Sequence, residues 1–204
     1  MNRNLKTAAT IAALGAAVLL SGCAFVPESV NLHYKAPTGQ GVAVPTSLNQ
    51  QEAVTVDVKS LRKHHDVGGR VNAYDMHIAG IGVSGGVSHS VKDALCTALK
   101  DKGFTIVPHG KALVHVDVLS FHGEGHAGFF TGNYRGHTAM RVAVKASNGK
   151  TLYSKTFTTK VRYGGYVLSG SGGTPKVLNA LLNQEINKIV DNPEFLHALQ
   201  VVEE

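Results

Sequence analysis

The sequence predicts an α+β fold: a curved, mainly antiparallel β-sheet with two main helices packed on one face and a short C-terminal helix. Several segments alternate apolar and polar side chains, which is typical of strands that bury one face. Two longer segments place their apolar residues on one side of a helix. No repeat unit recurs, and 43% of the 204 residues are hydrophobic, which is enough for one globular core.

The expected strands follow this alternation, and Asn148-Gly149 is typical of a two-residue hairpin turn. Residues 61–72 are polar and basic, so we expect a loop there. The strands are expected at residues 54–58, 105–107, 112–121, 137–146 and 150–162.

Capping residues delimit the expected helices. Thr174 is a good N-cap with Pro175 at the first helical position, and Gly103 is a typical C-terminal stop. We expect helices from Ser88 or Ser90 to Lys102, from Thr174 to Val190 and from Pro193 to Leu199.

The first 22 residues have the pattern of an export signal. Arg3 and Lys6 precede an apolar run from Ala8 to Leu20, which is too short for a stable membrane span. The run ends in Leu20-Ser21-Gly22-Cys23, which resembles the lipobox of bacterial lipoproteins. We therefore expect residues 1–22 to be a lipoprotein signal peptide and Cys23 to be acylated.

Acylated Cys23 would attach the chain to a lipid bilayer without spanning it. Position 24 is Ala and not the Asp that usually retains bacterial lipoproteins at the inner membrane, which favours the periplasmic face of the outer membrane. Pro, Gly and polar residues dominate up to residue 53, so residues 23–53 are expected to form a largely extended tether, although Val30 to Tyr34 could pair with a sheet edge. Residues 54–200 are expected to form a single α+β periplasmic domain.

No motif supports catalysis or a bound cofactor. Gly80-Ile81-Gly82-Val83-Ser84-Gly85 matches the glycine pattern of dinucleotide sites, but no acidic residue ends the next strand, so we expect a flexible loop leading into a helix. No Ser, Cys or Thr lies in a nucleophile elbow. We therefore expect a protein that is not an enzyme and has no cofactor.

A metal site is the weaker alternative at His122, Glu124 and His126. Alternate residues of a strand point to one face, so these side chains could meet one ion. The intervening glycines suggest mobility and a fourth ligand is not evident, so solvent-exposed loop histidines are the preferred interpretation.

Two sets of residues are candidates for binding a partner. Phe129 and Phe130 lie between glycines at an expected hairpin tip, where they either fold back on the sheet or dock a partner with Tyr163 and Tyr166. Arg62 and Lys63 lie in the expected basic loop, and Lys59 and Arg70 share it. Nucleic acid is excluded by the expected compartment, which leaves an anionic envelope lipid or an acidic protein.

Several short motifs, together with the lipobox, resemble the YajG family of bacterial outer-membrane lipoproteins. They are Asn31-Leu32-His33-Tyr34, residues 54–58 followed by Leu61-Arg62, Ala94-Leu95 through Lys102-Gly103-Phe104, residues 128–132, residues 149–153 and Asp191-x-Pro193-x-Phe195-Leu196. The resemblance implies a compact α+β domain and carries over no catalytic residue. The histidines before Gly128 lie outside its pattern, which weakens the metal hypothesis.

The favoured hypothesis is a non-enzymatic binding or scaffolding module of the periplasm, tethered through Cys23. One alternative is a metal-dependent envelope enzyme that uses the His/Glu cluster. Another is a structural oligomer joined through unpaired strand edges. The net charge of +6 falls to +4 without Arg3 and Lys6, which is too modest to identify a partner.

Overall fold

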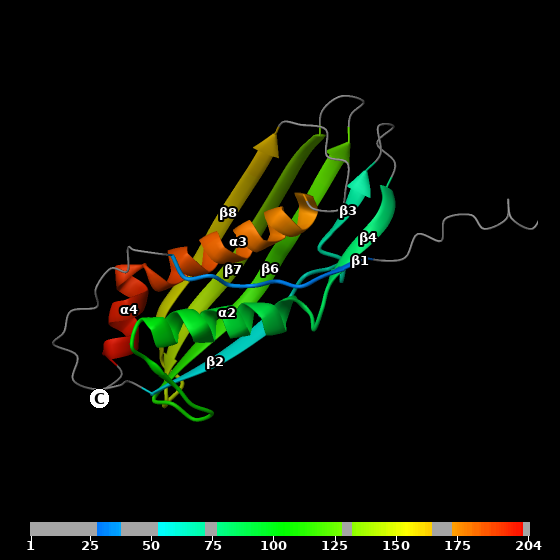
Figure 1. Ribbon diagram of the computed structural model, residues 1–204. Helices are drawn as coiled ribbons and strands as arrows, with labels where there is room; N and C mark the ends of the chain where they lie inside the picture. The colour runs from blue at the N-terminus through cyan, green and yellow to red at the C-terminus, as the bar shows by residue number, and fades with distance from the viewer. Residues whose placement is uncertain (1–27, 38–52, 72–76, 128–131, 165–172, 202–204) are drawn as a thin grey trace, which may run out of the picture.

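The computed structural model describes residues 28–37, 53–71, 77–127, 132–164 and 173–201 (Figure 1). The strands are β1 (Glu28–Val30), β2 (Ala53–Ser60), β3 (Gly68–Val71), β4 (His77–Val83), β5 (Thr105–Ile106), β6 (Ala112–Ala127), β7 (Gly132–Ala146) and β8 (Thr151–Gly164). The helices are α2 (Val87–Asp101), α3 (Gly173–Val190) and α4 (Pro193–Gln200).

In the described part of the chain, eight strands form one sheet built around the long strand β6. On one side, β6 pairs antiparallel with β7, and β7 with β8. On the other side, β2 runs parallel to the first half of β6 and β3 runs parallel to its second half. β5 extends the sheet from β2, while β4 and β1 extend it from β3.

The α+β class is therefore confirmed, but the expectation of a mainly antiparallel sheet was wrong because the sheet is mixed. Strands β2 and β6 are parallel, and the chain between them includes α2. A parallel pair needs such a crossover, whereas a hairpin always gives an antiparallel pair. The Asn148-Gly149 turn made the hairpin of β7 and β8 visible in the sequence. The pairing of β2 with β6 joins strands that are far apart in the sequence, so no local motif indicates it.

Strands β3 and β4 occupy segments that we expected to be loops, residues 61–72 and 80–85. Their glycines hide the alternation that identifies a strand. A Cβ atom at Gly68 would overlap the backbone carbonyl of Gly123, so Gly68 allows a close approach of β3 to β6. Gly80 and Gly82 lie within β4. The glycine motif is thus largely part of a strand.

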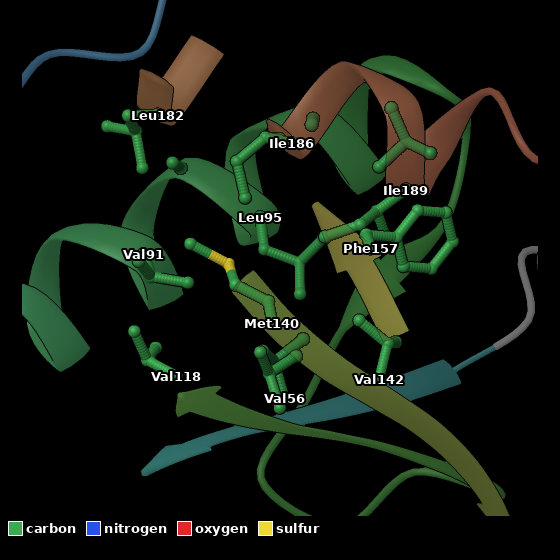
Figure 2. Close-up of a cluster of buried hydrophobic side chains, with 14 of the residues drawn as sticks. Val56, Val91, Leu95, Val118, Met140, Val142, Phe157, Leu182, Ile186 and Ile189 are labelled. Carbon is green, nitrogen blue, oxygen red and sulfur yellow. The ribbon is translucent and has the colours of Figure 1, made fainter. Parts of the chain in front are cut away.

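Helices α2 and α3 lie on the same face of the sheet (Figure 1), as the sequence predicted. Apolar side chains from both helices meet those of the strands in one core (Figure 2). The labelled residues of this core are Val91 and Leu95 of α2, Leu182, Ile186 and Ile189 of α3, and Val56, Val118, Met140, Val142 and Phe157 of the sheet.

The helix ends differ partly from the expected caps. Gly86, with a φ of 86°, precedes α2, and Ser90 donates its hydroxyl hydrogen bond back to the Gly86 carbonyl over 3.1 Å. Neither Ser88 nor Ser90 therefore caps α2. At α4 the Asn192 side chain accepts the Phe195 N–H over 2.9 Å, and Pro193 begins the helix as expected.

Two glycines allow α3 to pack directly on the sheet. A Cβ atom at Gly136 would lie 2.5 Å from Val177 Cγ1, and one at Gly123 would lie 3.0 Å from Leu178 Cδ2. We expected the glycines beside His122 and Glu124 to make this stretch mobile. Gly123 instead lies in β6 beneath α3, where a side chain would push the helix outward.

The residues after β1 lie along α3. The Asn179 side chain accepts the His33 N–H over 2.7 Å, and the Asn183 side chain accepts the Lys35 N–H over 2.6 Å. The Tyr34 hydroxyl donates to the Asn187 side chain over 2.7 Å. Residues 28–37, within the expected tether, therefore lie against the domain, and Val30 pairs with Val83 of β4 at the edge of the sheet, which the sequence left open.

Candidate functional site

His122, from the proposed metal site, lies on the sheet face opposite α2 and α3, which we call the outer face. Phe121 is only 2% exposed and Gly123 lies under α3, so the residue between them, His122, points to the outer face. His137 is its register partner on β7, and the two ring centroids are 5.7 Å apart. These rings form the centre of two adjoining grooves.

The first groove has a volume of about 520 Å³ and crosses β6, β7 and β8. Its polar side chains come from two rows of register partners, because neighbouring strands bring their paired residues side by side. The rows are His122, His137 and Lys160, and Glu124, Arg135 and Arg162.

The second groove has a volume of about 470 Å³ and shares His122 and His137 with the first. Its other wall is the loop between β2 and β3, which includes Arg62 and Lys63. Arg62 donates to the Asp66 carbonyl and to the His65 carbonyl, each over 3.3 Å, so its guanidinium holds the loop. Lys63 is exposed.

Positive charge predominates around the two grooves. The side chains that line the grooves include five Arg or Lys residues and only two carboxylates, together with three histidines. Arg135, Lys160 and Arg162 are exposed, whereas Glu124 is partly buried and its Oε2 lies 3.7 Å from His122 Nε2. The surface therefore suits an anion, and Arg side chains provide the paired donors that match a phosphate or carboxylate.

The aromatic candidates do not join this surface in the described residues. Tyr163 packs against the core on the α3 side of the sheet, and Lys176 Nζ lies 5.1 Å from its ring centroid. Phe129, Phe130 and Tyr166 lie outside the described residues, as does Cys23. Arg62 and Lys63 are thus brought together with His122 and His137 and not with Tyr163.

Of the three residues of the proposed metal site, His122 and Glu124 have described side chains, and these two are neighbours. The side chain of His126 is outside the described set. Within the described residues, no group of three or more His, Cys, Asp or Glu side chains is placed to hold a metal ion. The same residues lie in the basic surface described above.

A second polar cluster on the outer face was missed by the sequence analysis. His115 Nδ1 lies 2.9 Å from Asp57 Oδ2, and its Nε2 lies 3.2 Å from Asp117 Oδ1. Arg141 donates to Asp117 Oδ2 over 2.7 Å, and this hydrogen bond lowers the pKa of Asp117. The available signal was the i, i+2 spacing of His115 and Asp117, but their partners come from other strands.

This cluster is a ladder of hydrogen-bonded side chains across β2, β6 and β7, and it includes the ion pair of Asp117 and Arg141. Asp57 faces His115 and Asp117 faces Arg141 in the strand register. Among the described hydrogen bonds, no Ser, Thr or Cys side chain contacts His115 or Asp117. The arrangement therefore stabilises the sheet surface and does not match a nucleophile with its base.

Comparison with known families identifies the chain. Residues 42–200 match the profile of a family described as "Uncharacterized lipoprotein". The chain belongs to this YajG-type lipoprotein family. The resemblance found in its motifs is thereby confirmed. The search of proteins with curated descriptions found no match to this YajG-type chain.

A solved structure shows that the YajG-type chain shares its fold with another bacterial protein. This protein of Xanthomonas campestris, from the DUF330 family, aligns with a TM-score of 0.53 and 12% identity, over 81% of this chain and 92% of that chain. A minor lipoprotein of Acinetobacter baumannii aligns less closely, with a TM-score of 0.46 and 8% identity, over 72% of this chain and 95% of that chain.

Membership of a lipoprotein family makes this chain a membrane-anchored protein of the bacterial envelope. Among its described helices, none combines the length and the apolar character that a membrane crossing requires.

Proposed function

We propose that this YajG-type lipoprotein is a non-enzymatic binding module that recognises an anionic component of the bacterial envelope through its outer face. The observation that carries the proposal is the pair of adjoining grooves that share His122 and His137. Their excess of basic side chains favours a ligand that carries several negative charges.

The strand register supports a ligand of headgroup size. Arg135 and Arg162 are register partners, as are His137 and Lys160. Side chains directly opposite on antiparallel strands have Cβ atoms about 5 Å apart, so four donors surround an area that a phosphorylated group can cover. A volume of about 520 Å³ lies within the range of small-molecule sites.

The proposal includes anchoring by acylated Cys23 at the periplasmic face of the outer membrane. The lipobox and Ala24 support it. We expect Cys23→Ala to release the protein into the soluble fraction of a cell lysate, whereas the unchanged chain sediments with outer membranes. Equal membrane attachment of the two proteins would contradict the anchor.

Anion binding is tested with inositol hexakisphosphate as a soluble probe. The mature lipidated chain, held in neutral detergent micelles, is titrated by calorimetry. The double variant Lys160→Glu/Arg162→Glu is expected to bind the probe at least tenfold more weakly.

The matched control is Lys92→Glu/Lys100→Glu on α2, which changes the charge equally at exposed positions on the helix side. We expect this control to change the affinity less than twofold. An equal loss in both double variants would show that only net charge matters and would reject the grooves as a site.

A further inference from the structure

The position of β1 limits how far the domain can move from its anchor. Glu28 is the first residue of β1, and only residues 24–27 separate it from Cys23. Five residue steps span at most about 18 Å even when fully extended. The tether expected from the sequence, residues 23–53, would have reached about 100 Å.

The contacts of the chain after β1 prevent this tether from lengthening easily. β1 pairs with β4, and residues 33–35 bind the side chains of Asn179, Asn183 and Asn187 on α3. Val30 is 4% exposed and belongs to the core. Releasing the segment would break these contacts together.

The strand register places the basic grooves at the same height along the strands as β1, the strand that follows Cys23. One row of paired residues crosses the sheet through Glu28, Ile81, Gly68, Gly123, Gly136 and Val161. On each of the three long strands, the groove residues lie immediately before and after this row. They are His122 and Glu124 on β6, Arg135 and His137 on β7, and Lys160 and Arg162 on β8. With strands about 4.8 Å apart, the grooves begin about 14 Å from β1.

We propose that the outer face lies on the membrane that holds Cys23 and that its ligand is the phosphate of anionic lipid headgroups in that membrane. This inference rests on the proposed function and names the source of the anion. A tether of about 18 Å keeps a domain of this size against the bilayer. The high local concentration of headgroups then allows a weak site to remain occupied.

The charge distribution selects the face that meets the membrane. The exposed charges of α2 alternate in sign, with Lys92 beside Asp93 and Lys100 beside Asp101, and the exposed bases of α3, Lys176 and Lys188, are balanced at the ends of α3 and α4 by the exposed Asp191 and Glu194. The grooves carry a net excess of basic groups, and no described helix covers them. An anionic surface therefore attracts the outer face more strongly than the helix face.

The orientation is tested with fluorescent labels on the full mature chain in a Cys96→Ala background, since Cys96 is the free thiol of the described residues. Thr158→Cys labels the outer face two residues before Lys160, and Gln184→Cys labels the exposed side of α3. Each protein is reconstituted by its acyl chains into vesicles of phosphatidylcholine with 30 mol% phosphatidylglycerol. Lipids with a nitroxide on the headgroup quench nearby labels.

We expect quenching at position 158 to exceed quenching at position 184 at least threefold. The difference should disappear in vesicles of phosphatidylcholine alone and in Lys160→Glu/Arg162→Glu. Insertion of a 20-residue Gly/Ser linker before Glu28 should also reduce quenching at position 158. Equal quenching at the two positions, or stronger quenching at 184, would overturn the orientation.

The two proposals fail in different ways. If inositol hexakisphosphate binds the grooves but position 158 is not quenched, the binding function stands and the lipid source is wrong. If position 158 is quenched equally in neutral and anionic vesicles, the short tether alone orients the domain, which overturns headgroup phosphate as the ligand. Free inositol hexakisphosphate should compete with the lipid and reduce quenching at position 158, and unchanged quenching would likewise overturn a shared phosphate site.

Discussion

Thr159 of β8 donates a hydrogen bond of 2.5 Å to the Glu185 carboxyl of α3, and both side chains are buried. The Thr159 hydroxyl also accepts a hydrogen bond of 2.8 Å from Lys188 Nζ. The other carboxyl oxygen of Glu185 has no hydrogen-bond partner in the described part of the chain. Burial raises the pKa of Glu185 above its usual value, so the folded protein holds this proton more tightly than the unfolded chain does.

The first prediction is that Glu185→Gln changes how stability depends on pH. The unfolded carboxyl loses its proton first, so wild-type stability is full below about pH 4.5 and decreases as the pH rises toward the folded pKa. The glutamine side chain of this variant cannot ionise, so the variant should gain about 1 kcal/mol relative to wild type between about pH 4 and pH 8. Urea unfolding across this range measures the difference.

Glu194→Gln serves as the control for Glu185, because the Glu194 side chain is 68% exposed. It should leave the slope of stability against pH nearly unchanged. Parallel curves for wild type and Glu185→Gln would show that burial of Glu185 has no net electrostatic cost.

The second prediction concerns Asp117, whose pKa is lowered chiefly by the hydrogen bond from Arg141. The ionised carboxylate stabilises the fold above its unfolded pKa, and this contribution is lost as the pH falls through the lower folded pKa. Asp117→Asn should therefore destabilise the protein by about 2 kcal/mol at pH 7 and much less in strong acid, as urea unfolding at the two pH values would show. Asp57→Asn, at a side chain that is 46% exposed, should cost less than about 1 kcal/mol.

The third prediction is that Gly136→Ala displaces α3 from the sheet. The new Cβ atom would lie 2.5 Å from Val177 Cγ1 and 2.7 Å from Leu181 Cδ1. We expect a loss of about 2 kcal/mol in the free energy of unfolding, measured with urea. Val177→Ala should partly rescue this variant. Gly164→Ala, with no atom within 4 Å of its Cβ, is the neutral control.

The fourth prediction concerns the attachment of residues 33–35 to α3. Asn183 accepts the Lys35 N–H and donates to the His33 carbonyl over 3.0 Å. Asn183→Ala should increase the rate of trypsin cleavage after Lys35 at least fivefold, because the segment detaches more often. Gln184→Ala, the exposed neighbour, should not change the rate. Equal cleavage of both variants would mean that Asn183 does not hold the segment.

The elements with strong local patterns were predictable from the sequence. Strand β6, the hairpin of β7 and β8, and helices α2, α3 and α4 follow the alternation and the apolar faces read from it. Strands β3 and β4 were not predicted, because their glycines interrupt the alternation. These glycines allow close packing against residues that are distant in the sequence, as Gly68 does against Gly123.

For the site, the sequence identified Arg62 and Lys63 as candidates for binding a partner and, separately, His122 and Glu124 as candidates for binding a metal ion. It did not identify Arg135, Lys160 and Arg162 as their neighbours, since strand register alone brings these residues together. The ladder of Asp57, His115, Asp117 and Arg141 was hidden for the same reason.

The amino-acid sequence by itself determined the family, the expected lipid anchor and most helices and strands, because these depend on local motifs and on periodicity. Only the tertiary structure decided the mixed sheet, the attachment of residues 28–37 to the domain and the basic grooves of the outer face. Each of these depends on which distant segments pair, and pairing is set by the shared core under α2 and α3 and not by any one segment.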